Sequence, residues 1–110
     1  MSGNVVYEVN LDVEAAIIED YRAWLDAHVG DVCRLPGFID ADLYEVIDPA
    51  SEPGRVALCV QYRMRDAAAF QSYLAEHAPR MREEGEKRFG GRYAARRRVL
   101  VHLAREDCDR

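Results

Sequence analysis

Two histidines, His28 and His77, are the side chains of this sequence best suited to chemistry, because an unperturbed imidazole titrates near neutral pH. Each closes the same pattern of spacings, Tyr21-x-x-Trp24-Leu25-x-x-His28 and Phe70-x-x-Tyr73-Leu74-x-x-His77. Steps of three and four residues place both histidines on the inward face of a helix. Each is either a candidate general base or a partly buried histidine that ends an apolar stripe with one hydrogen bond.

A metal site built on the two histidines is not expected. The helices that carry them should run antiparallel, which separates the equivalent positions by roughly 15–20 Å at a rise of about 1.5 Å per residue. Cysteines Cys33, Cys59 and Cys108 are odd in number and form no close pair, so neither a disulfide framework nor a structural zinc site is predicted. We expect no metal and no cofactor.

Arginines near a double glycine offer a different chemistry. Arg88 and Arg92 flank Gly90-Gly91, where guanidinium groups and exposed amides could hold a small anion. The alternative is that the glycines simply end a helix with left-handed backbone.

The elements that position these residues follow from two periodicities. Alternation with period two predicts four strands, at residues 5–11, 38–47, 55–63 and 94–103. Helical spacing predicts two helices, with Asp12 and Asp66 as N-caps. Pro79 lies inside the second helix and should kink it near residues 76–78. The polar remainder from Ala104 is expected to be a frayed tail.

Strand, helix, strand repeated twice predicts an α+β ferredoxin-like βαββαβ fold. Right-handed crossovers then give a four-stranded antiparallel sheet in the order 4-1-3-2, with both helices on one face. The 110 residues suffice for one such domain, spanning 1–110 with an ordered core of about 5–103, and are too few for two ordinary domains.

The face of the sheet away from the helices is too apolar for a simple wet surface and too polar for a dry core. Alternation in the second strand assigns Phe38 to this face and Ile39 to the helix side. We expect a second copy of the chain to cover it, forming a homodimer. The residues predicted to form this interface are Glu8, Asp40, Asp42, Tyr44, Arg63, Arg96 and Arg98.

Charge and hydropathy exclude several classes of partner. The formal net charge is −5, and the basic side chains after residue 79 are interleaved with acidic ones, so internal neutralisation is favoured over binding to nucleic acid. No apolar run approaches the ~20 residues of a membrane helix, and Glu8 and Asp12 interrupt a signal-peptide pattern. We expect a cytoplasmic protein without membrane or nucleic-acid partners.

Five segments carry a resemblance to a known family. They are His28-Val-Gly-Asp-Val32, Leu35-Pro-Gly-Phe38, Val60-Gln-Tyr-Arg63, Tyr73-Leu-Ala-Glu-His-Ala-Pro79 and Arg88-Phe-Gly-Gly-Arg-Tyr93. Together, over nearly the whole chain, they resemble the bacterial family named domain of unknown function 4286. That family is similar to the dimeric α/β barrel superfamily, which includes antibiotic-biosynthesis monooxygenases, haem-degrading monooxygenases and muconolactone isomerases. The resemblance implies a dimeric barrel but no particular reaction.

The resemblance also implies a place for a ligand, between the helices and the sheet. The residues expected there are Tyr7, Tyr21, Trp24, His28, Phe70, Tyr73 and His77. Aromatic rings with polar tips suit a small hydrophobic or aromatic ligand, but a packed core is favoured over a pocket, because a small domain needs these side chains for packing. Haem oxidation has weak support: Asn10 and His77 could take two of the residue roles of that group, but Ala67 stands where it has a tryptophan.

Two functions therefore stay open. The first is a small-molecule-binding or structural module, since no nucleophile with a base, no carboxylate dyad and no metal cluster is evident. The second is a cofactor-independent monooxygenase or isomerase acting on a small aromatic or polyketide-like substrate. In it His28 or His77 would be the base, and Tyr21 or Tyr73 would orient the substrate. An open cavity of a few hundred Å³ that reaches a histidine would favour the enzyme.

Overall fold

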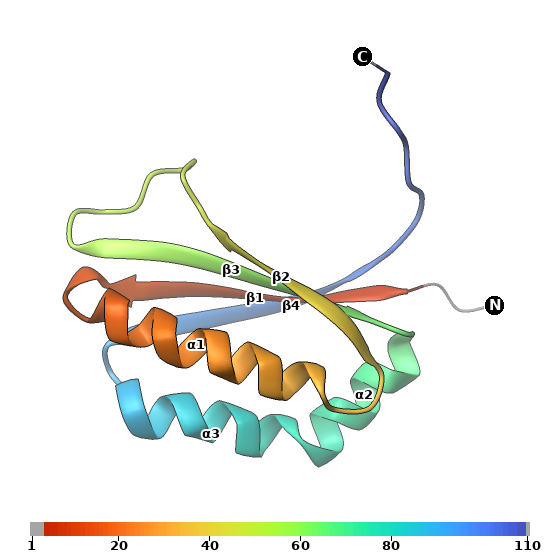
Figure 1. The fold of residues 1–110 in the computed structure, drawn as a ribbon, viewed down its shortest axis with the longest axis horizontal. Helices are drawn as coiled ribbons and strands as arrows, with labels where there is room; N and C mark the ends of the chain where they lie inside the picture. The colour runs from red at the N-terminus through yellow and green to blue at the C-terminus, as the bar shows by residue number, and fades with distance from the viewer. Residues whose placement is uncertain (1–3, 110) are drawn as a thin grey trace.

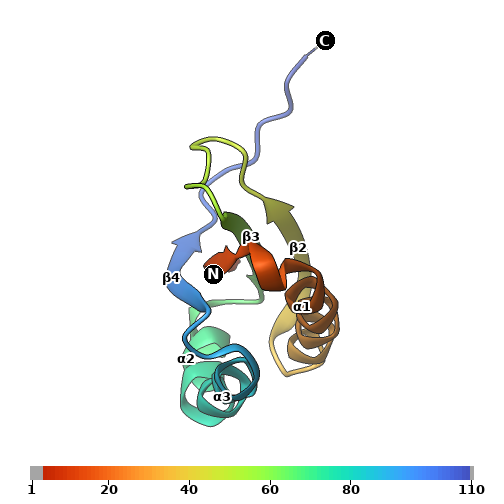
Figure 2. The same ribbon diagram turned by 90° about the vertical axis from the view of Figure 1, so that its left-hand side faces the viewer.

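The computed structural model describes residues 4–109 and has one four-stranded antiparallel sheet, with all the helices on one of its faces (Figures 1 and 2). The sheet order β2-β3-β1-β4 is the predicted order 4-1-3-2 read from the other edge, which confirms the ferredoxin-like topology. The elements are β1 (Val5–Glu14), the 3₁₀ turn η1 (Ala15–Ile17), α1 (Ile18–Cys33), β2 (Phe38–Glu45), β3 (Arg55–Met64), α2 (Ala67–Glu76), α3 (Ala78–Phe89) and β4 (Tyr93–Val101).

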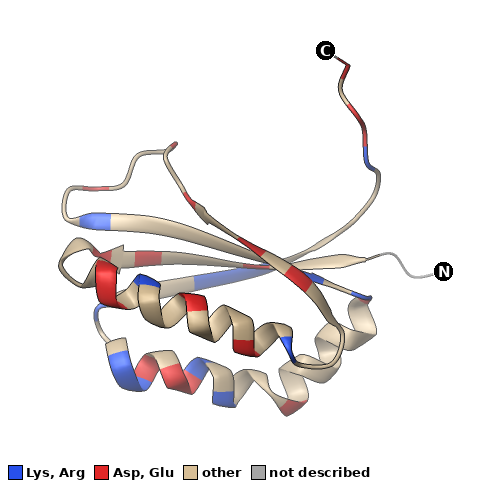
Figure 3. Ribbon diagram, in the orientation of Figure 1, with Lys and Arg blue, Asp and Glu red and all other residues tan. Residues whose placement is uncertain are grey.

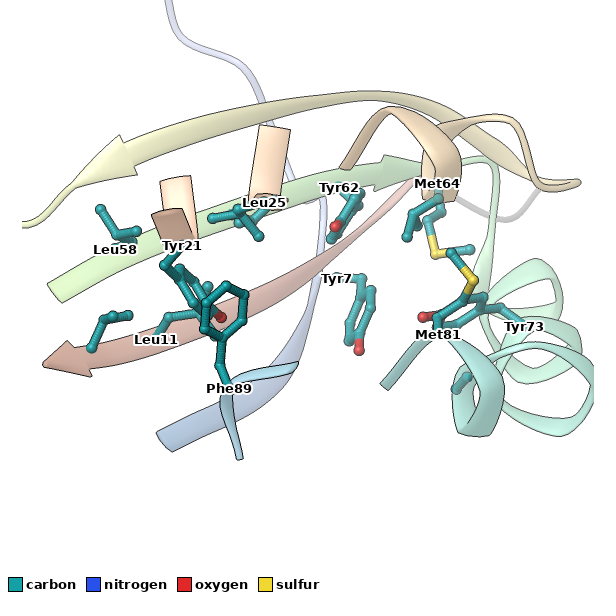
Figure 4. Packing of buried hydrophobic residues seen from close by; sticks show 14 of the residues in the cluster. Tyr7, Leu11, Tyr21, Leu25, Leu58, Tyr62, Met64, Tyr73, Met81 and Phe89 are labelled. Atoms are coloured by element: carbon teal, nitrogen blue, oxygen red, sulfur yellow. The ribbon is translucent and has the colours of Figure 1, made fainter. Parts of the chain in front are cut away.

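The core lies between the sheet and the helices. In β1, alternate residues from Val5 to Val13 point toward the helices and are buried or half-buried, as strand periodicity requires. They meet the corresponding residues of β3, of which Met64 is 0% exposed, and the inward face of α1, where Tyr21 is 1% exposed. Figure 4 shows how aromatic and sulfur-containing side chains from both layers interleave in this space.

The expectation that Asp12 caps the first helix is wrong. Val13 continues the buried alternation and is fully buried, so β1 extends to Glu14 and α1 begins only at Ile18, after η1. Asp12 is a strand residue whose carboxylate accepts a hydrogen bond from Arg55 at 3.0 Å. Burial of one more apolar side chain outweighs an early helix start.

The second helical segment is broken rather than kinked. Asp66 caps α2 as predicted, its carboxylate accepting a hydrogen bond from the Ala69 amide at 2.8 Å. His77 then leaves helical geometry, with φ −130° and ψ −32°, and α3 starts at Ala78 with Pro79 in its first turn. Because proline lacks an amide hydrogen, it fits the first turn of a new helix better than the middle of a continuous one.

Phe38 faces the helices, contrary to the sequence-based assignment to the open face. Its ring lies 5.5 Å from that of Tyr62 and 5.1 Å from that of Tyr73. The pairing of β2 with β3 shifts between Phe38 and Asp40, so Ile39 is an extra residue of a β-bulge and its side chain is exposed. A bulge reverses the alternation on one side of itself, which simple periodicity does not detect.

Gly37, just before β2, makes the close approach of α2 to the sheet possible. Its φ is +88°, and a β-carbon there would lie 2.6 Å from the Ala69 methyl. At the other helix end, Gly91 rather than Gly90 has the left-handed conformation, with φ +84°.

Beyond β4, residues 102–109 form an exposed extended arm. Figures 1 and 2 show it leaving the body of the molecule on the side of the sheet opposite the helices. The loop between β2 and β3 rises on the same side in Figure 1, and the two flank the open face of the sheet. Within residues 4–109, no helix has the length and apolarity to cross a membrane.

Candidate functional site

A small cavity of about 50 Å³ lies between α1, α3 and the helix-facing side of the sheet. Five of the six tyrosines of the chain contribute to its wall. The lining side chains are Tyr7, Val9, Leu11, Tyr21, Trp24, Leu25, His28, Val60, Tyr62, Tyr73, Met81, Arg82, Gly85, Tyr93 and Arg97. This volume admits a few water molecules and is well below the roughly 300 Å³ or more of a typical ligand pocket.

Tyr7 extends from β1 into the centre of this layer (Figure 4). Its ring centroid lies 5.6 Å from both the Tyr62 and the Tyr73 centroids, distances typical of aromatic pairs. The Tyr7 hydroxyl accepts a hydrogen bond of 3.2 Å from Nη2 of Arg82 on α3. A buried phenol on the sheet is thereby joined to a charged side chain of the helix layer.

Trp24 and His28, one turn apart on α1, form another part of the wall. Their rings are stacked, with centroids 4.5 Å apart and an interplanar angle of 19°. Gly85 allows the Trp24 indole to pack closely against α3, since a β-carbon at position 85 would lie 2.9 Å from the indole ring. The four-residue spacing of Trp24 and His28 brings the two rings onto one helix face.

His28 is a buried titratable side chain with one ring nitrogen left unpaired. Its Nδ1 is buried and makes no hydrogen bond, although Oε1 of Glu84 lies 3.5 Å away. Burial lowers the pKa of His28 below 6.5, while Glu84 acts in the opposite direction and only partly compensates. Burial therefore favours the neutral imidazole, whose Nδ1 is left without a hydrogen bond.

The tyrosines around the cavity are held in their protonated form. Burial raises the pKa of Tyr21, Tyr62 and Tyr73 above the ordinary value of 10.0, and neighbouring phenols add to the effect. These hydroxyls can donate and accept hydrogen bonds at neutral pH, but they are poor bases.

Outside the cavity, an open groove of about 440 Å³ runs between α3 and β4. It shares Arg82, Tyr93 and Arg97 with the inner cavity, so the two spaces adjoin at these side chains. The other residues along the groove are Glu83, Glu86 and Ala95.

Five of the residues expected around a ligand, Tyr7, Tyr21, Trp24, His28 and Tyr73, line the inner cavity. Phe70 and His77 are not among the lining residues. Phe70 packs against the Tyr7 ring at 5.2 Å, and His77 lies at the break between α2 and α3, its Nδ1 3.3 Å from Nη2 of Arg80.

Arg88 and Arg92 lie away from both spaces. The Arg88 guanidinium is 5.4 Å from the centroid of the Phe89 ring, and Arg92 pairs with Glu14 at 3.0 Å. Periodicity did not single out Arg82, Tyr93 and Arg97, although alternation in β4 contains the signal: Tyr93, Ala95 and Arg97 share the parity that faces the helices. Among residues 4–109, no group of three His, Cys, Asp or Glu side chains could hold a metal ion.

Several solved structures of other proteins have the same fold as this chain. A cofactor-independent oxygenase of Streptomyces nogalater, SnoaB, superposes with a TM-score of 0.60 at 18% identity, covering 96% of this chain and 97% of that one. A Nitrosomonas europaea protein with a provisional assignment as an antibiotic biosynthesis monooxygenase gives a TM-score of 0.65 at 15% identity, covering 94% and 93%. The de novo designed protein Foldit4 gives 0.63 at 17%, covering 91% and 99%.

A designed protein and an oxygenase thus share this architecture, so the likeness identifies a fold and not an activity. No curated protein matches the sequence at a significant level. The sequence pattern of one family, the domain of unknown function DUF4286, matches residues 4–103. The chain therefore belongs to the DUF4286 family and has a ferredoxin-like fold, which it shares with SnoaB and the Nitrosomonas europaea protein.

Proposed function

We propose that this protein is a small-molecule-binding module whose ligand lies in the groove between α3 and β4 and reaches the inner cavity. The observation that carries the proposal is that a groove of about 440 Å³ adjoins, at Arg82, Tyr93 and Arg97, a cavity walled by five tyrosines, Trp24 and His28. Aromatic rings with polar tips recognise flat organic molecules through stacking and hydrogen bonds.

Binding is favoured over catalysis because the inner cavity, at about 50 Å³, is too small for a whole substrate. Its walls are held by ring-to-ring contacts, such as those of Tyr7 with Tyr62 and Tyr73.

A thermal-shift screen of phenols, polyketide-like aromatics and haem tests the proposal, because a ligand that binds only the native state raises the Tm. Ala95→Leu narrows the groove from inside, whereas Ala94→Leu adds the same volume on the opposite side of the same strand. Stabilisation by a hit should be lost in the first variant and kept in the second. Equal stabilisation in both would place the ligand elsewhere and refute the proposed site.

A cofactor-independent oxygenase or isomerase is the second candidate, favoured by one observation at His28. A neutral, buried imidazole nitrogen without a hydrogen bond is suited to take a proton from an enol or phenol. Oxygen uptake with ionisable naphthols would reveal the first activity, and loss of uptake in His28→Gln with His77→Gln unaffected would assign the base. Absence of turnover with every ligand that binds would leave only the binding module.

The open face of the sheet supports a homodimer. Arg98 pairs with Glu8 at 2.6 Å and Arg63 pairs with Asp40, both within one chain. Asp42 and Arg96 form no ion pair among residues 4–109, and Tyr44 is 48% exposed beside the buried Cys59. A second copy packed on this face, between the arm and the β2–β3 loop, would cover the aromatic surface and supply partners for the two charges.

Size-exclusion chromatography with light scattering tests the dimer directly. We expect Asp42→Ala to weaken dimerisation more than it lowers the Tm, and Asp26→Ala on the outer surface of α1 to change neither. Arg98→Ala should also weaken the dimer, although it removes the main partner of Glu8 as well. A clean monomer at micromolar concentration, or unchanged dimer affinity in the first and third variants, would overturn the homodimer.

We also propose a cytoplasmic location. The three thiols are free: Cys59 is buried, Cys33 is half-buried and Cys108 lies in the exposed arm. An exposed, unpaired thiol is better suited to a reducing compartment than to an oxidising one. Fractionation of cells that express a tagged chain checks this expectation.

A further inference from the structure

Two guanidinium groups stand where the groove meets the inner cavity, Arg82 from α3 and Arg97 from β4. Neither forms an ion pair with any carboxylate among residues 4–109. The one hydrogen bond that Arg82 makes there goes to a neutral phenol, the Tyr7 hydroxyl. Figure 3 shows β4 as a basic stretch beside a helix of mixed charge.

The acidic residues nearest to these arginines are engaged with other groups. Glu83 pairs with Lys87 at 3.0 Å, and Glu84 faces His28. Glu86 accepts a hydrogen bond from the Tyr93 hydroxyl at 3.1 Å. Three carboxylates of α3 therefore leave the two exposed positive charges at the junction without a direct counterion.

The charge of Arg97 lowers the pKa values of several tyrosines around the cavity. Burial raises the pKa of Tyr21 and Tyr73, and the Arg97 guanidinium opposes that rise at both. The pKa of Tyr93 is raised by burial and by Glu86, and Arg97 again acts against the rise. One arginine thus favours negative charge at several places around the same space.

We propose that the ligand is an aromatic monocarboxylate, an inference that rests on the proposed binding function and names its ligand class. Its carboxylate would lie between Arg82 and Arg97, which can present a planar fork of N–H donors to two oxygens. Its ring would lie along the groove against Tyr93 and Ala95. Glu83 and Glu86 on the rim would repel a second negative charge at the far end of the ring.

The test compares three probes of one shape: naphthalene-2-carboxylate, the neutral naphthalene-2-carboxamide and the dianion naphthalene-2,6-dicarboxylate. Calorimetric titration should show the monocarboxylate binding at least about ten-fold more tightly than the carboxamide, the preference of a charge-assisted over a neutral hydrogen bond. The dicarboxylate should bind more weakly than the monocarboxylate. Trp24, the single tryptophan, lies in the cavity wall and supplies a fluorescence readout of the same binding.

Substitutions test whether Arg82 and Arg97 cause the preference for the carboxylate over the carboxamide. Arg97→Gln and Arg82→Gln should each reduce the affinity for the monocarboxylate about ten-fold and leave that for the carboxamide nearly unchanged. Arg80→Gln removes an exposed arginine of α3 that lines neither space and should alter neither affinity. Circular dichroism and the Tm confirm that each variant is folded.

The outcomes separate the two proposals. If carboxylate and carboxamide bind equally, or if Arg97→Gln and Arg82→Gln keep the preference, the anion inference is overturned while the binding module stands. If none of the three probes binds and Ala95→Leu changes no ligand response in the wider screen, the binding module fails and the inference fails with it.

Discussion

The two faces of the sheet handle buried polar groups in opposite ways. On the helix side, phenolic hydroxyls are buried among aromatic rings, and the guanidinium groups of Arg82 and Arg97 stand at the edge without a counterion. On the open face, Glu8 is 3% exposed and its carboxylate accepts hydrogen bonds from Arg98, Asn10 and Gln61, at 2.6, 2.9 and 2.9 Å.

The difference separates stability from recognition. A buried carboxylate that accepts hydrogen bonds from three side chains is a paired network that connects three neighbouring strands. Unpaired arginines beside a groove have spare donors and are free to bind. Substitutions that reduce side-chain volume should therefore lower the free energy of unfolding mainly on the helix side. Substitutions that remove charge, and changes of pH, should lower it mainly on the open face.

Truncation of the helix-side core should have the largest effect. Met64 is 0% exposed and lies against Met81 and Tyr73 in Figure 4, so Met64→Ala removes buried volume that the surrounding rings cannot fill. We expect the free energy of unfolding to fall by about 2–5 kcal/mol in urea titrations. Val101→Ala, on the same side of the sheet but 60% exposed, should change it by less than about 0.5 kcal/mol. Equal losses in the two variants would show that the burial of Met64 contributes nothing to stability.

Removal of the charge on the open face should have the next largest effect. In Glu8→Gln an amide NH₂ replaces one acceptor oxygen and opposes the donors of its neighbours, for a loss of about 1–3 kcal/mol at pH 7. Asp42→Asn, an exposed change on the same face, is the control and should have a much smaller effect. Measurement over a range of protein concentrations separates this loss from a change in dimer affinity. A Glu8→Gln protein as stable as wild type would show that the network contributes nothing.

The pH dependence of stability should carry the signature of Glu8. The hydrogen bond from Arg98, together with that from Asn10, lowers the pKa of Glu8 from 4.5 to about 2, against the effect of burial. Between these values the unfolded chain binds more protons, so stability increases with pH. The contribution of Glu8 is full above pH 4.5 and is lost as the pH falls toward 2. The difference in unfolding free energy between wild type and Glu8→Gln should shrink over that interval, and a constant difference would refute the assignment.

Most of the architecture was predictable because it depends on simple periodicity and chain handedness. The errors arose where one local interaction overrides the pattern. Burial of Val13 extends β1 past Asp12, the bulge at Ile39 turns Phe38 toward the helices, and the conformation of His77 divides one helix into two. Each is a choice between nearly equal local alternatives that only tertiary packing decides.

The candidate site was predictable in its aromatic part only. Residues Tyr21, Trp24 and His28 follow from helical spacing, whereas Arg82 and Arg97 belong to two different elements, α3 and β4, and no single periodicity links them. Their charges resemble the solvated ones around them until the fold brings them to one groove. The repeated pattern that ends in His28 and His77 also misleads, because the same spacings place one histidine in the cavity wall and the other at a helix break.

The smallest effect on stability should come from changes around His28, where burial and a nearby carboxylate act on the pKa in opposite directions. Burial lowers its pKa below 6.5, Glu84 and Asp31 raise it, and Arg97 lowers it. An NMR titration of the imidazole should therefore give a midpoint below 6.5, and Glu84→Gln should move that midpoint lower still. Because Glu84 is 46% exposed, its removal should change the stability by less than about 1 kcal/mol.

Glu83→Gln is the matched control, because the carboxylate of Glu83 pairs with Lys87 and not with His28. This variant should leave the titration midpoint of His28 unchanged. The sign of the shift is the decisive quantity. A carboxylate near an imidazole favours the charged ring. Loss of Glu84 therefore removes the main effect that raises the pKa of His28 against burial, and the neutral ring is dominant over a wider pH range. A midpoint that rises in Glu84→Gln would mean that Glu84 does not face the ring in solution. It would also remove the reason to regard His28 as a buried base held near a compensating charge.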